Sequence, residues 1–176
     1  MPRIRKIAGT ALFIAIGIAL PLAFHSIPNA GRVFLPMHIP VLLCGLICGF
    51  PWGLACGVVA PLLSSLLTGM PPAAMLPAML CELAVYGLAA ALLIRYTPVK
   101  NAYARIYIAL IGAMLSGRLV MGALNALIFS AGNYSTRIWL TGAFVTALPG
   151  IALQMVLIPA IMLGLQKAKL IDVRSC

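Results

Sequence analysis

The sequence predicts an all-α integral membrane protein, a compact bundle of six transmembrane helices with both termini in the cytoplasm. Of its 176 residues, 64% are hydrophobic and only 8% are charged, and the mean hydropathy is +1.14. A soluble domain usually carries about 25% charged residues, so this chain cannot cover itself with a polar surface. Because no long polar segment interrupts the apolar stretches, we expect residues 1–176 to form a single membrane domain.

Six apolar segments account for most of the chain, and each is interpreted as a span. A helix rises about 1.5 Å per residue, so about 20 residues cross the hydrocarbon core of a bilayer. The segments cover about residues 7–27, 38–50, 52–69, 74–95, 104–130 and 139–166. The first has a basic start and an apolar stretch too long for the core of a signal peptide, so we expect it to be retained.

A small-residue stripe runs along the first segment. Its members recur every four residues, which places them on one helix face. They are Ala11, Ala15, Ala19 and Ala23, hereafter the alanine stripe. Small residues let another helix approach closely, so the stripe predicts a docking surface for a partner protein. Packing within the bundle is the alternative.

The second and third segments are short, and GFPWG (49–53) separates them. Proline and glycine stop helices, and tryptophan favours the membrane interface. We therefore expect two spans here, whereas one long span over 38–69 is the competing interpretation.

The basic residues indicate the orientation of the spans. With the N-terminus inside, only Arg32 and Arg137 fall on the outer side. The cytoplasmic side receives Arg3, Arg5, Lys6, Arg95, Lys100, Arg105, Lys167, Lys169 and Arg174. This positive-inside asymmetry requires an even number of spans with both termini cytoplasmic. Four spans would satisfy it too, but the break within 38–69 favours six.

Two charged residues, Glu82 and Arg118, lie well inside the predicted spans, where an unpaired charge costs about 2.5–3.5 kcal/mol. Tyr86 shares a helix face with Glu82, and Asn125 shares one with Arg118. These faces could line one outward-opening cavity, and Gln154 in the last segment is predicted to be buried as well. A structural Glu82–Arg118 ion pair and a guanidinium that binds a ligand carboxylate are two compatible interpretations.

The stretch GRVFLPMHIP (31–40) is predicted to be an outer loop that leads into the second span. Its prolines restrict its shape, so it can act as a lid. Phe34 and Met37 would cover a ligand, while Arg32 and His38 would offer hydrogen-bond donors. Anchoring of the loop is the alternative for each residue, and for His38 so is a packed, satisfied imidazole.

Several classes of function lack their residues. The cysteines form no CxxC pair, and His25 and His38 have no third ligand beside them, so we expect no metal or cofactor. Intramembrane aspartyl chemistry needs two acids, and the predicted spans hold one. Without a Walker A sequence the chain cannot hydrolyse ATP by itself. We expect a protein that is not an enzyme.

Two segments, PMHIPVLLCGLICG (36–49) and SSLLTGMPP (64–72), carry the most specific part of a resemblance that covers nearly the whole chain. The chain resembles the substrate-binding S components of energy-coupling factor (ECF) vitamin transporters. The resemblance implies that loops 28–37 and 69–74 close over a vitamin near the outer face of a prokaryotic cell membrane. It also implies that the alanine stripe docks on a transmembrane coupling subunit, which works with two cytoplasmic ATPase subunits.

The vitamin stays open at this point. Arg118 together with Glu82 suits pantothenate, nicotinate or a pyridoxine-type vitamer, and a small carboxylate ranks first because of Arg118 and Arg32. For a neutral or cationic ligand, Glu82 would be the more important residue. Two alternatives come from other classes of protein. One is a membrane enzyme that acts on a lipid or prenyl substrate, with Arg118 on a phosphate and Glu82 as base. The other is a self-contained small oligomeric transporter.

Overall fold

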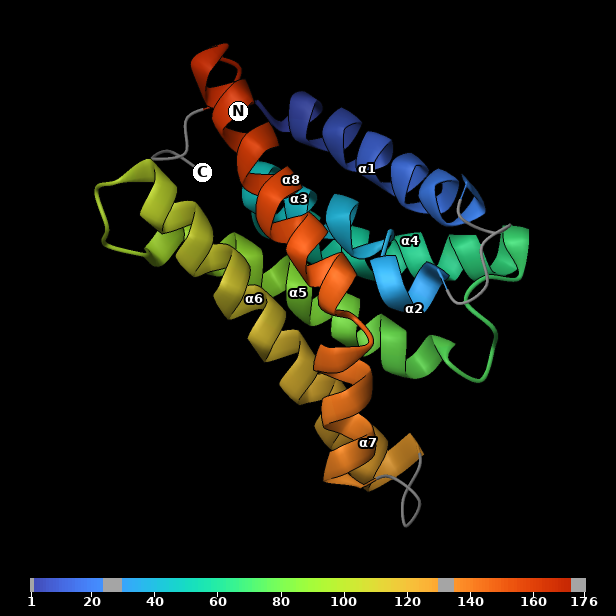
Figure 1. Cartoon of the computed structure of the whole chain (residues 1–176). Coiled ribbons are helices and arrows are strands. Elements are labelled where there is room, and N and C mark those ends of the chain that lie inside the picture. Colours follow the sequence, from blue (N-terminus) through green and yellow to red (C-terminus); the bar gives the residue numbers. More distant parts are fainter. Residues whose placement is uncertain (1, 24–29, 130–134, 172–176) are drawn as a thin grey trace.

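The structure is a computed structural model that describes residues 2–23, 30–129 and 135–171. All regular structure within these ranges is helical, with no strand. The α-helices are α1 (Arg3–Ala23), α2 (Ala30–Phe34), α3 (His38–Cys48), α4 (Trp52–Thr68), α5 (Leu76–Tyr96), α6 (Ala102–Leu124), α7 (Thr136–Leu140) and α8 (Leu148–Lys167). Two π-helical segments, η1 (Asn125–Phe129) and η2 (Thr141–Val145), follow α6 and α7. Figure 1 shows the helices packed as a bundle, with the start of α1 and the end of α8 at the same end.

Helix α3 is the centre of the bundle. All eleven of its residues are buried, and it contacts α1, α4, α5, α6 and α8. Its sequence explains this position, because a helix that is apolar on every side can be stable only when neighbours surround it. The one strongly polar side chain at its start, His38, is therefore held inside the protein.

The predicted break between the second and third segments is confirmed. Helix α3 ends at Cys48 and α4 begins at Trp52, so one long span over 38–69 is wrong. Gly49 donates its N–H to the carbonyl oxygen of Gly45 and has φ 73°, a conformation that favours glycine.

Three glycines hold α3, α4 and α5 at close range. A Cβ on Gly45 would lie 2.6 Å from the carbonyl oxygen of Gly87, and one on Gly53 would lie 2.5 Å from the same atom. Real Cβ atoms do not approach so closely, so these positions accept only glycine. Without side chains the helix backbones touch, which is the usual way in which small residues stabilise membrane helix pairs.

The number of helices is larger than the six predicted. The helices long and apolar enough to cross a membrane are α1, α5, α6 continued by η1, and α8, while α3 and α4 are shorter apolar helices. The short helices α2 and α7 lie in segments that join these six. Sequence periodicity cannot identify helices of five residues, since they complete little more than one turn.

The sixth predicted segment, 139–166, is not one continuous helix. Helix α7 and η2 come first, and α8 begins only at Leu148. Pro149 occupies the first turn of α8, where its missing N–H costs nothing. Pro149 therefore suits the start of a new helix.

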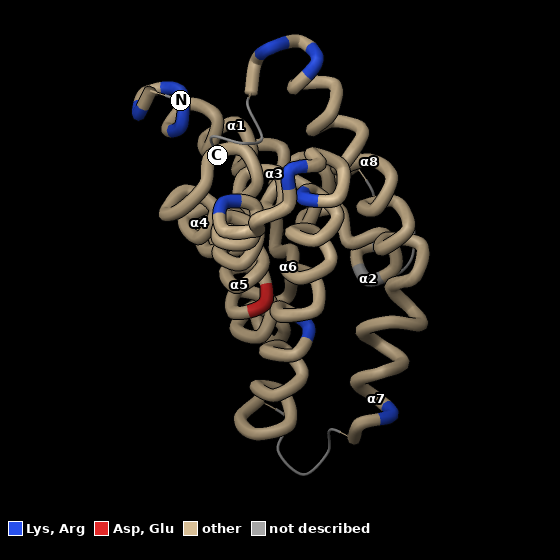
Figure 2. The backbone as a smooth tube through the Cα atoms, turned by 90° about the vertical axis from the view of Figure 1, so that its left-hand side faces the viewer, with Lys and Arg blue, Asp and Glu red and all other residues tan. Residues whose placement is uncertain are grey.

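Lysine and arginine residues gather at one end of the bundle (Figure 2). They lie at the start of α1, around the connection from the end of α5 to the start of α6, and at the end of α8. Arg137 in α7 lies at the opposite end (Figure 2). Within the described residues, Arg137 is thus separated from the basic residues that the sequence assigned to the other side of the membrane.

Candidate functional site

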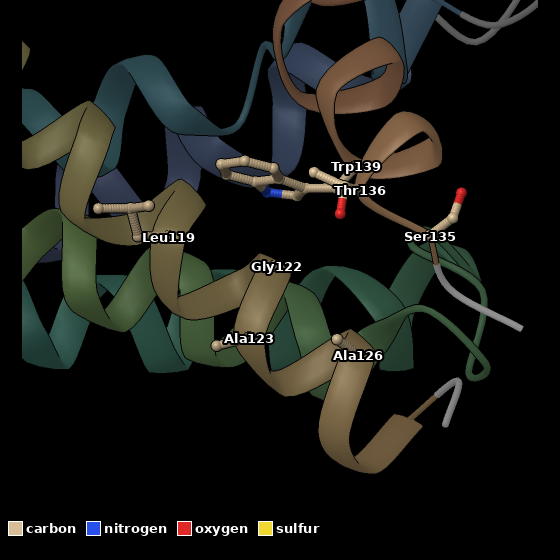
Figure 3. Close-up of a pocket in the computed structure, with 7 residues that line it drawn as sticks. All are labelled: Leu119, Gly122, Ala123, Ala126, Ser135, Thr136 and Trp139. Carbon is tan, nitrogen blue, oxygen red and sulfur yellow. The ribbon is translucent and has the colours of Figure 1, made fainter. Parts of the chain in front are cut away.

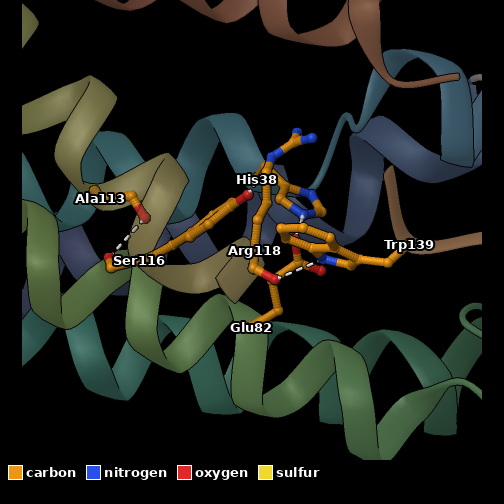
Figure 4. Close-up of polar contacts among 7 residues, drawn as sticks. His38, Glu82, Ala113, Ser116, Arg118 and Trp139 are labelled. Carbon is orange, nitrogen blue, oxygen red and sulfur yellow. Dashed lines mark hydrogen bonds and ion pairs between the residues drawn. The ribbon is translucent and has the colours of Figure 1, made fainter. Parts of the chain in front are cut away.

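Three helices bring polar side chains together inside the bundle. His38 begins α3, Glu82 and Tyr86 lie one turn apart on α5, and Arg118 lies on α6. These four residues, hereafter the polar cluster, are all buried, with 2% of His38 and 2% of Arg118 exposed. Figure 4 shows His38, Glu82 and Arg118 converging between their helices. The sequence predicted each of the four as a site residue.

The carboxylate of Glu82 is paired with His38. Its Oε1 lies 3.7 Å from Nε2 of His38, whose ring also meets the ring of Tyr86 edge-on at 5.2 Å. Among the described residues, Glu82 has this contact with a basic side chain and no ion pair with Arg118. The interpretation of Glu82 and Arg118 as a direct ion pair therefore does not match the geometry, because His38 takes that place beside the carboxylate.

Arg118 is held through its Nε atom and its backbone. Nε donates to the hydroxyl oxygen of Tyr86 at 3.0 Å, and the indole Nε1 of Trp139 donates to the carbonyl oxygen of Arg118 at 3.1 Å. The ring of Tyr86 fills the space that a Cβ on Gly117 would need. The guanidinium carbon also lies 5.5 Å from the ring centroid of Phe144, within the range of a cation–π contact.

Several buried polar atoms have no hydrogen-bond partner within the described part of the chain. They include both ring nitrogens of His38, Nη1 of Arg118, and both polar side-chain atoms of Gln154 on α8, and also Oε1 of Gln166 near the end of that helix. More than about 90% of buried polar groups in proteins are satisfied, and an unsatisfied one costs about 1–3 kcal/mol. The bundle therefore holds donors and acceptors that are suited to a polar ligand.

The other predicted pocket residues are placed differently. Asn125 is half-buried, and its amide donates to the backbone oxygen of Met121 in the preceding turn at 2.9 Å. Met37 is buried and belongs to the hydrophobic core, and Phe34 on α2 is half-buried. Arg32 lies in α2, but its side chain is outside what the structure describes.

Helix α2, in the segment that the sequence predicts to be a lid, packs against the last helix. A Cβ on Gly150, in the first turn of α8, would lie 2.7 Å from the carbonyl oxygen of Val33 and 2.8 Å from that of Phe34. Helix α2 thus rests directly on the backbone of α8, at the end of the bundle opposite to the start of α1 (Figure 1). Ser64 and Ser65 of α4 donate to the carbonyl oxygens of Met70 and Pro71 and so hold the loop that follows α4.

A cavity of about 270 Å³ lies between α6 and α7, separate from the atoms of the polar cluster. It is lined by Leu119, Gly122, Ala123, Ala126, Ser135, Thr136 and Trp139 (Figure 3). Sequence reasoning missed Trp139 and Phe144 as neighbours of Arg118. The signal was present in WLTGAF (139–144), where two aromatic residues precede the last long helix.

The alanine stripe faces away from the bundle. Ala11, Ala15, Ala19 and Ala23 are all exposed, whereas the buried residues of α1 are Thr10 and Gly17. Gly17 is the close contact on the inner face, since a Cβ there would lie 3.4 Å from the Cβ of Ala60. The packing of α1 in the bundle therefore uses a different face from the stripe.

Comparison with known proteins gives the family. The model of the family "ECF transporter, substrate-specific component" matches residues 5–162. The chain belongs to this family of ECF substrate-specific (S) components. No curated protein and no solved structure matches the chain. The predicted family is thus confirmed.

Membership defines the class of function. An S component is a membrane-embedded transporter subunit and not an enzyme. It binds a small-molecule substrate and works with a membrane coupling subunit and ATPases. The interpretation as a lipid or prenyl enzyme is therefore wrong.

Proposed function

We propose that this S component captures a small carboxylate-bearing vitamin, such as pantothenate or nicotinate, in the polar cluster. The observation that carries the proposal is Arg118, which is almost fully buried and whose Nη1 has no hydrogen-bond partner among the described residues. A guanidinium binds a carboxylate with two parallel hydrogen bonds, and a charge within a membrane span is costly, so a residue that carries one usually has a function.

The remaining polar groups fit the rest of such a ligand. His38 through Nδ1, and Gln154 through its side-chain amide, can exchange hydrogen bonds with hydroxyl, amide or ring nitrogen atoms of the ligand, since these buried atoms have no hydrogen-bond partner among the described residues. Glu82 can accept from a ligand donor, and Tyr86 orients Arg118 through its hydroxyl. Asn125 uses one N–H on the backbone of Met121, so it could offer a ligand only its other N–H and its Oδ1.

The loop that contains α2 and the loop after α4 would form the lid. We propose that Phe34 and Met37 cover the ligand together with loop 69–74, and that Arg32 adds a positive charge at the entrance. The contact between α2 and Gly150 supports this role, because it couples the lid segment to α8, the helix that carries Gln154.

The charge distribution supports an orientation. The basic end of the bundle would face the cytoplasm of a prokaryotic cell, with both termini inside, and the lid would face outward. The exposed alanine stripe would dock on the coupling subunit, which would work with two cytoplasmic ATPase subunits. Four small side chains on one outward face allow a close helix contact of the kind that drives association in lipid.

Mass spectrometry of the bound ligand tests the proposal. The protein is purified in detergent without any added vitamin, and the small molecules that come with it are identified. We expect a small molecule with a carboxylate group, in about one copy per protein. If only lipid is released, or the molecule lacks an acidic group, capture of a carboxylate vitamin is refuted.

A further inference from the structure

Two aromatic residues outside the polar cluster reach Arg118 from the segment of α7 and η2. The indole Nε1 of Trp139 donates to the carbonyl oxygen of Arg118 at 3.1 Å, a contact drawn in Figure 4. The ring of Phe144 lies 5.5 Å from the guanidinium carbon. The two rings also meet each other edge-on, with centroids 5.6 Å apart and planes at 88°. Together they contact both the backbone and the side chain of Arg118.

Helix α6 leaves room for the indole of Trp139 at Gly122. The ring of Trp139 fills the space that a Cβ on Gly122 would occupy, one helical turn beyond Arg118. Any larger residue at position 122 would push the ring away from the helix. The same indole lines the cavity between α6 and α7 (Figure 3). The hydrogen bond to Arg118 and the contact with Gly122 together hold the ring against α6.

These contacts determine which part of the guanidinium is available. Nε is occupied by Tyr86, and Phe144 lies over the guanidinium, while Nη1 has no partner among the described residues. Arginine is long and flexible, and in a membrane span it extends toward water when nothing holds it. Aromatic contacts that keep the guanidinium inside the bundle also fix the direction in which its Nη1 points.

We infer that Trp139 and Phe144 are positioning residues that fix the Arg118 guanidinium for a ligand carboxylate, and thereby set the preference for acids over their neutral analogues. This inference rests on the proposed function, since only there does Arg118 bind the ligand. Neither aromatic residue needs to touch the ligand. Their effect is on the direction of one charged group, so it concerns the carboxylate and not the rest of the molecule.

The test compares each acid with its neutral analogue. Affinities of the purified protein are measured for nicotinate against nicotinamide and for pantothenate against panthenol. In Phe144→Leu and Trp139→Phe we expect the preference for the acid to fall about fivefold to tenfold, with unchanged affinity for the neutral analogue. Phe144→Tyr keeps the aromatic face and is expected to keep the preference. Matched controls are Phe50→Leu, at an exposed aromatic residue, and Trp52→Phe, at the other tryptophan.

Equal losses for acid and neutral analogue, or no loss of preference, overturn the inference, because a residue that only stabilises the fold would not discriminate between the two ligands. Should none of the four compounds bind the unmodified protein, the proposed ligand class fails, and arginine modification decides the inference alone. Phenylglyoxal is expected to modify exposed Arg137 but not Arg118 in the unmodified protein, and to modify Arg118 in both variants. Continued protection of Arg118 in both variants overturns the inference.

Discussion

The polar cluster and the alanine stripe are opposites in their chemistry and in their place in the bundle. The cluster puts charged and polar side chains where the surroundings are apolar, and several of its atoms lack a partner within the described residues. The stripe puts the smallest apolar side chains on an outer face, where they leave a shallow surface against lipid. Each region carries residues that its surroundings alone would not favour. Such residues are typical of a surface that binds a ligand or a partner protein.

A second set of small residues makes the contrast sharper. Gly45, Gly53 and Gly87 also let helices approach closely, but they do so inside the bundle, where α3, α4 and α5 already touch. The alanine stripe has the same physical property on a face that no described helix covers. If the account is correct, the polar cluster determines ligand binding and the stripe determines coupling, so mutations should separate the two.

The largest effect is expected in transport. Ala15→Leu or Ala19→Leu should reduce uptake by whole cells to background, because a leucine on the stripe prevents close approach of a partner helix. Ligand binding by the purified variant should stay within about twofold, since the stripe lies on the outer face. Ala19→Ser keeps a small side chain and serves as the control. Loss of binding in the leucine variants would instead assign the stripe to packing of the bundle.

The largest effect on binding is expected for Arg118→Ala. A hydrogen bond to a charged group contributes about 1.5–3 kcal/mol, so the affinity for a carboxylate ligand should fall roughly 10- to 100-fold. The control is Arg137→Ala, because Arg137 is exposed to water at the far end of the bundle. Equal and intact affinities in the two variants would refute the assignment of the pocket. Titration calorimetry with nicotinate or pantothenate measures both.

A smaller loss is expected for Tyr86→Phe. The substitution keeps the ring against His38 and Gly117 but removes the hydroxyl that accepts from Nε of Arg118. The loss of one such bond costs about 1 kcal/mol, so ligand affinity should fall about fivefold. Tyr103→Phe, at an exposed tyrosine, is the matched control. The idea that Tyr86 orients Arg118 fails if binding is the same in both.

The smallest effect is expected for Asn125→Ala. Its amide donates to the backbone of its own helix, so the ligand affinity should change less than about twofold. The same titration measures it. A loss comparable to that of Arg118→Ala would show that Asn125 contacts the ligand, and the pocket would then extend further along α6.

Much of the fold could be predicted from the sequence because its determinants are local. Length and hydropathy identify the long helices, and GFPWG (49–53) marks the end of α3 and the start of α4. The break before α8 was missed even though Pro149 is visible in the sequence, since apolar composition continues on both sides of it. Helices α2 and α7 were missed because five residues carry no periodic signal.

The candidate site could be predicted only residue by residue. Buried polar residues stand out against an apolar background, so Glu82, Tyr86, Arg118 and His38 were found. Their pairing could not be found, because periodicity gives the face of a helix and not the neighbour that it meets. The partner of Glu82 is His38, 44 positions earlier in the chain, and Arg118 meets aromatic residues of a later segment.

One paired measurement tests the separation of binding from coupling most directly. The unmodified protein, Arg118→Ala and Ala19→Leu are purified side by side without added ligand, and the bound small molecule is quantified per protein by mass spectrometry. The account predicts a carboxylate-bearing molecule in the unmodified protein, the same amount in Ala19→Leu, and little or none in Arg118→Ala. Retention of the molecule by Arg118→Ala, or its loss from Ala19→Leu, would contradict the account.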